Sequence, residues 1–251
     1  MECVFITGAS SGIGRATALH FSKIHAELIL VSRRMDKLNE VREECLVAGA
    51  QAVQVFSLDV TDSVAVQSYF RTHQEILSKV TVLVNNAGLA LGMSSFQESL
   101  PEDTLTMIRT NFEAAVSIVQ GMLPHFLSKS SGHIVQLGSV AGRWTYPKGS
   151  IYCATKAALK VFSEGLRMDL SGTGIRVSEI APGLVETDFS RVRFKGDEEK
   201  ANVPYRGLDP LTADDIAETI LWVCLRPRHI KVQELIIYPT AQASPTVVHR
   251  Q

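Results

Sequence analysis

The sequence predicts an α/β protein, in which a single doubly wound parallel sheet of seven strands has helices on both faces. Short aliphatic, often β-branched runs recur along the 251 residues, and longer segments with helical spacing separate them. The runs are apolar on both faces, as in a sheet that helices cover on each side. We find no internal repeat, low-complexity tract or linker, so we expect one domain over residues 1–251.

The elements alternate along the chain. The predicted strands are residues 3–7, 27–32, 52–59, 80–86, 132–139, 175–182 and 232–238. The predicted helices are residues 12–23, 36–48, 62–77, 105–127, 152–170 and 212–225. The segment at about 183–210 fits neither pattern and follows the carboxyl end of a strand, where open α/β sheets bind ligands. Since a long irregular insertion is usually functional, we expect a substrate loop there.

Composition limits the possible functions. The chain is 45% hydrophobic and 20% charged, with a net charge of -1, so no general attraction to nucleic acid or to an anionic membrane is expected. The N-terminus does not resemble a secretory signal, and no run of 18 apolar residues occurs, which predicts a cytoplasmic protein. The four cysteines and seven histidines are scattered without metal-ligand spacing, so we expect neither disulfides nor a metal site.

A glycine-rich turn, TGASSGIG at residues 7–14, follows the first strand and opens the first helix. Gly8 permits the tight turn, Gly12 lets the backbone approach a pyrophosphate, and Gly14 allows close packing of helix on strand. The helix N-terminus favours an anion at this position. The turn therefore predicts a dinucleotide site, whose other members here are Ser10, Ser11 and Ile13.

The end of the second strand indicates which dinucleotide binds. Dinucleotide sites usually have an acidic residue there, which accepts hydrogen bonds from the adenosine ribose. This sequence instead has Ser32, Arg33 and Arg34. Two guanidinium groups suit a 2′-phosphate, so the sequence predicts NADP(H) rather than NAD(H). The alternative is that both arginines only solvate the start of the next helix.

Two further strand ends carry polar groups. Asp59, followed by Val60, can accept a hydrogen bond from the adenine amino group, or it can cap the helix that begins near Asp62. The motif NNAG at residues 85–88 either forms a simple turn or braces the sheet edge beside the cofactor. We favour the second interpretation for this motif, whose cofactor-binding members are Asn86, Ala87 and Gly88.

Tyr152 and Lys156 lie one helical turn apart, a spacing that also occurs on ordinary solvated helices. Because a free tyrosine has a pKa near 10, a catalytic phenolate needs a stabilising cation, and Lys156 and the positive nicotinamide ring are the candidates. Ser139 ends the fifth strand and can hold a substrate oxygen or cap a turn. Asn111 lies within a predicted helix, where asparagine is unfavourable unless it is exposed or has a special role.

Together these motifs, TGxxxGxG, NNAG, Ser139, YxxxK and the PG of APGLVETDF at residues 181–189, resemble the short-chain dehydrogenase/reductase family over essentially the full length. The resemblance implies a Rossmann-like fold and a homotetramer. It implies that Tyr152 exchanges the substrate proton, that Lys156 also binds the nicotinamide ribose, and that Asn111 holds a water in a proton relay. It further implies that the nicotinamide and phosphates are approached by Pro182, Gly183, Val185 and Thr187.

Three loop sequences, NNAGLALGM, VRFKGDEEKA and the final VHRQ, resemble the NADP-dependent 3-hydroxy acid dehydrogenases, which oxidise serine, allo-threonine and related acids. A carboxylate substrate needs a cationic partner, and we expect Arg193 or Arg143 to supply it, unless they only solvate the surface. Arg143 departs from the relatives. The alternatives are a carbonyl or diketone reductase of the same family and a non-catalytic NADP-sensing scaffold. The presence of all four catalytic residues disfavours the scaffold.

Overall fold

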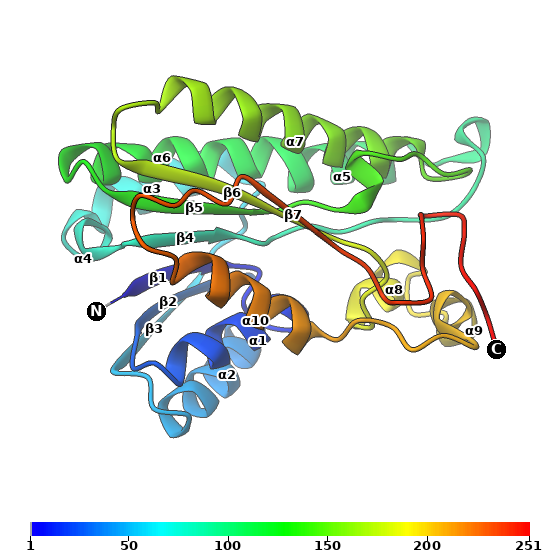
Figure 1. The fold of residues 1–251 in the computed structure, drawn as a ribbon, viewed down its shortest axis with the longest axis horizontal. Coiled ribbons are helices and arrows are strands. Elements are labelled where there is room, and N and C mark those ends of the chain that lie inside the picture. Colours follow the sequence, from blue (N-terminus) through cyan, green and yellow to red (C-terminus); the bar gives the residue numbers. More distant parts are fainter. Residues whose placement is uncertain (1) are drawn as a thin grey trace.

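The computed structural model describes residues 2–251 and contains one seven-stranded parallel sheet (Figure 1). The strand order is β3-β2-β1-β4-β5-β6-β7, so the order reverses between β1 and β4. Open sheets bind ligands at such a switch point. The strands are β1 (Cys3–Thr7), β2 (Glu27–Ser32), β3 (Ala52–Ser57), β4 (Val82–Asn85), β5 (Gly132–Leu137), β6 (Ile175–Pro182) and β7 (Glu234–Ile237).

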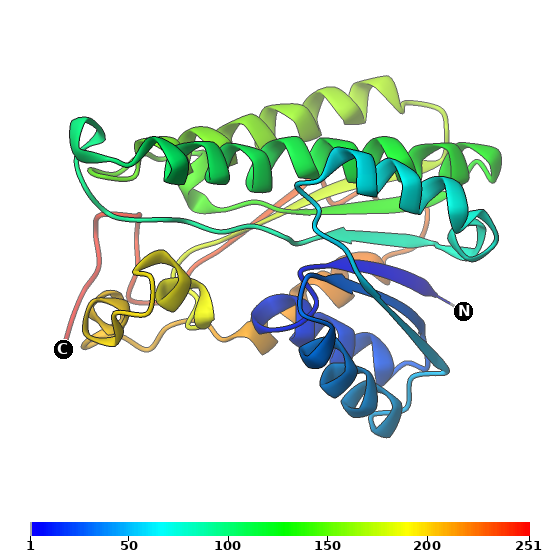
Figure 2. The same ribbon diagram turned by 180° about the vertical axis from the view of Figure 1, so that it is seen from behind.

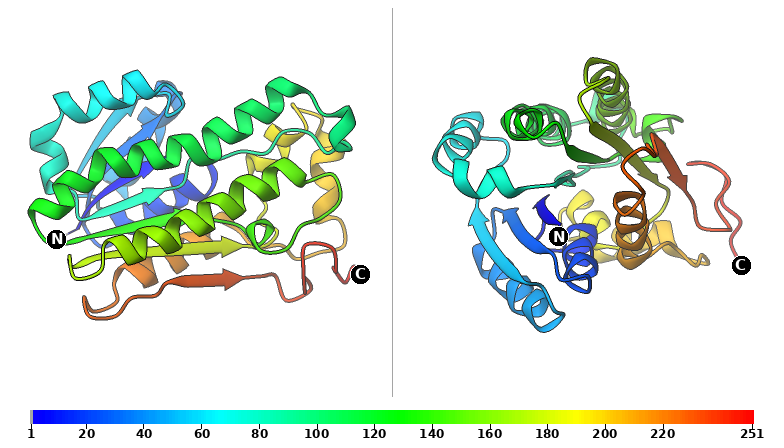
Figure 3. Two further views of the ribbon diagram at one scale, coloured as in Figure 1. Left: turned by 90° about the horizontal axis from the view of Figure 1, so that it is seen from above. Right: turned by 60° about the vertical axis from the view of Figure 1, so that its left-hand side comes forward.

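Helices cover both faces of the sheet (Figures 1 and 3). One face packs against α1 (Gly12–Ser22), α2 (Met35–Val47) and α10 (Ala213–Cys224). The other face packs against α3 (Ser63–Thr72), α4 (Gln74–Lys79), α6 (Ala114–Ser128) and α7 (Ser150–Asp169), with α5 (Pro101–Ile108) beside α7. None of the helices within residues 2–251 is long and apolar enough to span a membrane.

The central strand β1 shows why the apolar runs predicted this architecture. All five of its residues are buried. Val4 and Ile6 belong to the hydrophobic core on the α1 side, whereas Phe5 belongs to the core on the α6 side. A strand between two helical layers must be apolar on both faces. The predicted seven-stranded, doubly wound fold is confirmed.

The helix expected at residues 62–77 is two helices, because the chain leaves helical geometry at His73. Its backbone has φ -112° and ψ 30°. The Nδ1 of His73 lies 2.9 Å from the carbonyl oxygen of Tyr69, and the two rings stack with centroids 4.4 Å apart. A side chain that engages a carbonyl of the preceding turn commonly breaks a helix. Hydrophobic periodicity continues across the break, so the sequence pattern did not reveal it.

The helix expected at residues 105–127 starts earlier and is interrupted. Pro101 occupies the first turn of α5, where its missing N–H costs nothing. Between α5 and α6 the chain forms a π-helical turn, η2 (Arg109–Glu113), in which hydrogen bonds skip one more residue than in an α-helix. Such turns often mark functional sites, and this one carries Asn111.

The segment at 183–210 is less irregular than predicted, since it contains α8 (Asp188–Arg193), α9 (Glu198–Asn202) and a 3₁₀ turn, η4 (Val203–Tyr205). Residues 239–251, here called the tail, return to this segment, and the chain ends beside α9 (Figures 1 and 2). The backbone N–H of Gln251 donates to the carbonyl of Gly207 at 3.1 Å. Thr187 and Asp197 each cap one of these short helices, α8 and α9. The helices escaped prediction because neither is long enough to show periodicity.

Candidate active site

A cavity of about 690 Å³ opens at the carboxyl ends of the strands. It brings together residues from the first turn, the ends of β2 to β6 and the segment after β6. Nearly all predicted cofactor residues line it: Gly8, Ser10, Ser11, Gly12, Ile13, Ser32, Arg33, Arg34, Asp59, Val60, Asn86, Ala87, Gly88, Tyr152, Lys156, Pro182, Gly183, Val185 and Thr187. Its lining also includes Ser139 and Arg193, but not Gly14, Asn111 or Arg143.

The glycine-rich turn leaves backbone open to this cavity. Gly8 and Gly12 have φ values of +65° and +53°, which side chains rarely adopt. A Cβ on Gly8 would lie 2.9 Å from the Nδ2 of Asn86, so a larger residue does not fit. A Cβ on Gly14 would lie 2.4 Å from the carbonyl oxygen of Gly8. Gly14 therefore packs helix on strand, as its position predicted, and does not contact the cavity itself.

The part of the cavity next to the end of β2 is cationic. The Nη2 of Arg34 donates to the hydroxyls of Ser10 and Ser11, at 3.0 Å each, and its backbone N–H donates to the Oγ of Ser32 at 3.2 Å. Arg33 lines the same cavity. Arg34 thus faces the glycine-rich turn, and both arginines line the cavity. Two guanidinium groups with hydroxyls beside them form a donor set suited to a phosphate.

Asp59 lines the cavity and does not cap α3. Its carboxylate accepts from the backbone N–H of Thr61 at 2.9 Å and from the Thr61 hydroxyl at 2.7 Å. The α3 N-terminus is capped by Asp62, which accepts from the backbone N–H groups of Val64 and Ala65. The capping alternative for Asp59 is therefore excluded.

The NNAG motif braces the sheet at the switch point. The Nδ2 of Asn86 donates to the carbonyl of Thr7 at 2.9 Å and to that of Gly8 at 3.3 Å. In return, the Oγ1 of Thr7 accepts from the backbone N–H groups of Asn86 and Ala87, each at 2.9 Å. These bonds join the ends of β1 and β4, so the bracing interpretation is confirmed.

Tyr152 and Lys156 both come from α7 and reach the cavity beside Ser139. The Oγ of Ser139 accepts from the backbone N–H of Ala141 at 3.1 Å, and so caps the 3₁₀ turn η3 (Val140–Gly142). The same side chain lies in the cavity with Tyr152 and acts to lower the pKa of the phenol. Ser139 therefore caps a turn and also faces the tyrosine, although the sequence presented these roles as alternatives.

The expected action of Lys156 on the phenol is not found. Burial raises the pKa of Tyr152 well above its usual value, while Ser139 and Arg193 oppose that rise. The Nζ of Lys156 instead donates to the carbonyl of Leu137 at 2.7 Å, and burial lowers the pKa of Lys156 to about 8. The ammonium is thus directed at a carbonyl, and burial is the largest influence on the pKa of Tyr152.

Asn111 is 1% exposed, so it is not a surface residue. Its Oδ1 accepts from the backbone N–H of Leu89 at 2.8 Å, and its Nδ2 donates to the carbonyl of Leu89 at 2.8 Å and to the hydroxyl of Thr155 at 3.1 Å. A Cβ on Gly88 would lie 3.3 Å from the Oδ1 of Asn111 and 3.4 Å from the Nζ of Lys156. The π-helical turn thus directs Asn111 to the loop after β4, next to Lys156.

The two arginines proposed for a substrate carboxylate lie in different environments. Arg193, at the end of α8, donates from Nη2 to the hydroxyl of Tyr146 at 3.1 Å, and its guanidinium carbon lies 5.9 Å from the centre of the Tyr152 ring. The Arg143 side chain is only 7% exposed and forms ion pairs with Glu179 at 3.1 Å and Glu234 at 2.9 Å. The assignment of Arg143 to the substrate is wrong, because two carboxylates already bind its guanidinium.

Sequence reasoning missed several cavity residues. Tyr146 could have been predicted as a cavity residue, because it is an aromatic residue in a loop six positions before Tyr152. Gln242 in the tail carried none, although its Oε1 accepts from the backbone N–H of Leu184 at 2.8 Å. The other unpredicted lining residues from α8 onward include Phe189, Val192, Phe194, Lys200, Val203, Pro204, Tyr205, Pro245, Val248 and Arg250.

Comparison with known proteins decides the family. The family model described as short chain dehydrogenase matches residues 2–198. The chain belongs to the short-chain dehydrogenase family. Among its curated relatives is a sulfoacetaldehyde reductase of Chromohalobacter salexigens, which is 42% identical and aligns over 96% of this chain and 95% of its own. An NADP-dependent 3-hydroxy acid dehydrogenase of Schizosaccharomyces pombe is 39% identical over 100% of this chain and 97% of its own.

Solved structures of this family have the same fold. The closed form of a serine dehydrogenase complexed with NADP+ superposes with a TM-score of 0.91 at 38% identity, over 99% of this chain and 100% of that one. A serine dehydrogenase from Escherichia coli superposes with a TM-score of 0.82 at 33% identity, over 96% and 99% of the two chains. The family and the predicted α/β architecture are thus established.

Proposed function

We propose that this short-chain dehydrogenase transfers a hydride between NADP(H) and a small 3-hydroxy acid such as serine or allo-threonine, or the corresponding oxo acid. The observation that carries the proposal is the placement of Arg193, whose guanidinium lies in the same cavity as Tyr152 and 5.9 Å from its ring. An anionic group bound there leaves the hydroxyl of a short substrate within reach of the phenol. Relatives named for 3-hydroxy acids and serine support this substrate class.

The donor set of the cavity fits NADP. Arg33 and Arg34 would hold the 2′-phosphate, the open backbone around Gly12 would hold the pyrophosphate, and Lys156 would hold the nicotinamide ribose. A relative named NADP-dependent and a neighbouring structure solved with NADP+ support the choice over NAD. The cofactor supplies the hydride acceptor or donor at its nicotinamide ring.

The chain's own residues handle the proton. Ser139 holds the substrate oxygen by a hydrogen bond, and Tyr152 gives a proton to that oxygen in reduction or takes one from it in oxidation. Burial raises the pKa of the phenol, so Tyr152 holds the proton that reduction requires, although the same rise makes the phenol a weaker acid. In oxidation the same proton must first leave, through Lys156 and the relay that we propose for Asn111.

The segment at 183–210 acts in this proposal as a substrate lid. Its helix α8 supplies Arg193 and Phe189, and the ring of Phe189 lies 5.6 Å from that of Tyr152. Gln242 from the tail hydrogen-bonds the start of the segment. The ring of Phe189 and the guanidinium of Arg193, one turn apart on α8, would together exclude water and orient an anionic substrate.

A second candidate is a small sulfonate in place of the carboxylate. Two reductases for sulfoacetaldehyde from Chromohalobacter salexigens are 42% and 43% identical to this chain. A guanidinium group binds a sulfonate as readily as a carboxylate, so Arg193 serves either anion. A carbonyl or diketone reductase, in contrast, would require no cation in the cavity.

Initial rates test these candidates directly. L-serine, allo-threonine, 3-hydroxypropionate, isethionate and a simple diketone are each assayed with NADP(H) and NAD(H). We expect turnover of an anionic alcohol with a preference for NADP+. Faster reduction of the diketone would favour the carbonyl reductase, and equal use of NAD+ would remove the 2′-phosphate assignment. NADP+ binding without turnover of any substrate would indicate a sensing scaffold.

We also propose a cytoplasmic homotetramer. Large apolar side chains remain exposed on α5 and α7, and they include Leu105 at 50%, Val161 at 63% and Met168 at 72%. Monomers rarely leave so many large apolar groups on adjoining helices. Multi-angle light scattering should give four times the mass of the chain, and a monomer would contradict the proposal.

A further inference from the structure

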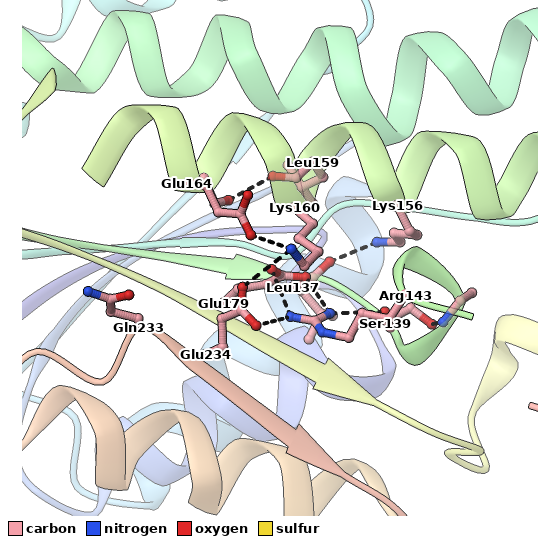
Figure 4. Close-up of polar contacts among 12 residues, drawn as sticks. Leu137, Ser139, Arg143, Lys156, Leu159, Lys160, Glu164, Glu179, Gln233 and Glu234 are labelled. Carbon is pink, nitrogen blue, oxygen red and sulfur yellow. Dashed lines mark hydrogen bonds and ion pairs between the residues drawn. The ribbon is translucent and has the colours of Figure 1, made fainter. Parts of the chain in front are cut away.

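A cluster of charged side chains lies between the helix α7 and the strands β6 and β7 (Figure 4). Arg143 is at its centre and holds Glu179 by two hydrogen bonds, from Nη1 at 3.1 Å and from Nη2 at 3.2 Å. The Glu179 side chain is fully buried. Arg143 also contacts Glu234, which lies 3.8 Å from Lys160 and 3.6 Å from Arg167 on α7. The cluster therefore ties β6, β7 and α7 together.

This cluster touches the strand end that carries the catalytic groups. The Nη1 of Arg143 donates to the carbonyl of Ser139 at 3.4 Å. A Cβ on Gly138 would lie 2.0 Å from the Oε1 of Glu179, so the carboxylate fills the space that a side chain would need. The carbonyl that binds Lys156 belongs to Leu137, the preceding residue. Residues 137–139 are thus held by the ion pair on one side and support the catalytic groups on the other.

The charge of Glu179 also acts on Lys156, in addition to the contacts that the ion pair makes with residues 138 and 139. Burial favours the neutral amine of Lys156, and the negative charge of Glu179 opposes this effect. Charged or titratable groups around Lys156 come from every element that packs here: Tyr152 and Lys160 from α7, Glu179 from β6, Glu234 from β7, Arg143 from the loop after β5 and Arg193 from α8. Glu179 is the charged side chain whose influence on Lys156 is largest.

We propose that the Arg143–Glu179 ion pair is a positioning device for the catalytic centre. It fixes the backbone from which Ser139 and Lys156 are held, and it keeps a negative charge close to the Lys156 ammonium. Both residues act through others and touch neither substrate nor cofactor. The inference rests on the proposed function, since it gives Lys156 and Ser139 their roles in the reaction.

Glu179→Gln tests the charge while keeping the shape. The readout is the pH profile of kcat/KM for NADPH-dependent reduction of malonate semialdehyde or sulfoacetaldehyde, whichever the wild type reduces faster. By the reverse of the proton path proposed for oxidation, the ammonium of Lys156 returns a proton to Tyr152 during reduction, so activity falls as pH rises through the pKa of Lys156. Without the carboxylate this pKa decreases, and we expect the alkaline limb to move to lower pH by about one unit.

Two variants serve as controls. Glu179→Asp keeps the negative charge, and its alkaline limb should stay near that of the wild type even if kcat falls. Glu164→Gln removes a carboxylate that pairs with Lys160 at the exposed edge of the cluster and contacts neither Ser139 nor residue 138. Its profile should be unchanged. A merely structural role for Glu179 would lower stability in both Glu179 variants without moving the limb.

Each outcome decides the inference. An alkaline limb in Glu179→Gln that coincides with the wild type overturns it, while a shift confined to that variant supports it. If Glu179→Gln does not fold, Glu234→Gln removes the partly exposed partner of Arg143 and should move the limb in the same direction by a smaller amount, and no movement overturns the inference. A wild type that turns over no substrate instead overturns the proposed function and the inference with it.

Discussion

Two arginines separated by fifty positions in the chain show how differently the molecule uses the same side chain. Arg193 projects into the cavity, where a tyrosine hydroxyl and a backbone carbonyl hold its guanidinium without neutralising its charge. Arg143 lies outside the cavity, where the carboxylates of Glu179 and Glu234 compensate its charge. The difference teaches that an arginine available for an anionic ligand is one whose local partners are neutral.

The two walls of the cavity also differ, in whether backbone or side chains form them. The cofactor wall is built from backbone held in place by glycines and by the bonds between Thr7 and Asn86. The substrate wall is built from side chains of short helices and of the tail. Backbone groups can bind any dinucleotide, whereas the identity of a side chain decides which substrate it contacts. Specificity for the substrate therefore lies in the second wall.

The largest expected effect lies where the two walls meet. Tyr152→Phe removes the proton donor and should lower kcat by about 10³-fold, within the range of general acid–base catalysis. NADPH affinity, measured by fluorescence titration, should stay close to that of the wild type because the adenosine contacts remain. Full activity in this variant would place the proton transfer on another residue.

Breaking the buried pair should lower stability and leave substrate binding unchanged. Arg143→Gln leaves the Glu179 carboxylate buried with no compensating partner, which typically costs about 3 kcal/mol. We expect a lower urea midpoint, and a KM for the anionic substrate near the wild-type value. A large rise in KM with unchanged stability would return Arg143 to the substrate site and reverse the comparison.

Arg193→Gln should give the opposite pattern. Loss of one charge-assisted hydrogen bond to an anionic substrate should lower kcat/KM by about 10- to 100-fold, through KM, with little change in the urea midpoint. Arg191→Gln is the matched control, since Arg191 is two residues earlier on α8 but pairs with Asp188 and Glu198 in solvent. Equal effects in the two variants would mean that the lid, and not the guanidinium of Arg193, was disturbed.

At neutral pH the smallest expected effect is that of pH itself on the wild type. Lys156 has a pKa lowered by burial to about 8, so its ammonium is present below that pH and lost above it. The rate of carbonyl reduction should be constant near neutral pH and fall about tenfold per unit well above pH 8. A reduction rate that stays flat to pH 10 would show that the ammonium is not needed.

The strands could be predicted because a buried parallel strand must be apolar on both faces, which leaves a mark on consecutive residues. The cofactor wall could be predicted because its glycines meet steric needs at fixed spacing. The role of Arg143 could not be predicted, since a sequence does not show that Glu179 and Glu234 lie on adjacent strands with their side chains toward it. Gln242 was missed for a similar reason, because its partner is 58 positions away.

The helical pattern also hid two breaks. His73 ends α3 through its own side chain, and the π-helical turn at Asn111 depends on contacts with Leu89 and Thr155 from other elements. Both interruptions preserve the periodic burial of apolar residues on either side. The departure at Asn111 is decided by tertiary contacts, and it shows that such a departure can place a polar group at the site.

The tail fastens the lid at two points, since Gln242 bonds Leu184 and Gln251 bonds Gly207. Any swing of α8 and α9 away from the cavity must therefore detach or carry along the last dozen residues of the chain. Opening for product release then requires the segment at 183–210 and the tail to move together. A bulky fusion placed after Gln251 would act on turnover through this coupling, even though it would lie outside the reaction chamber.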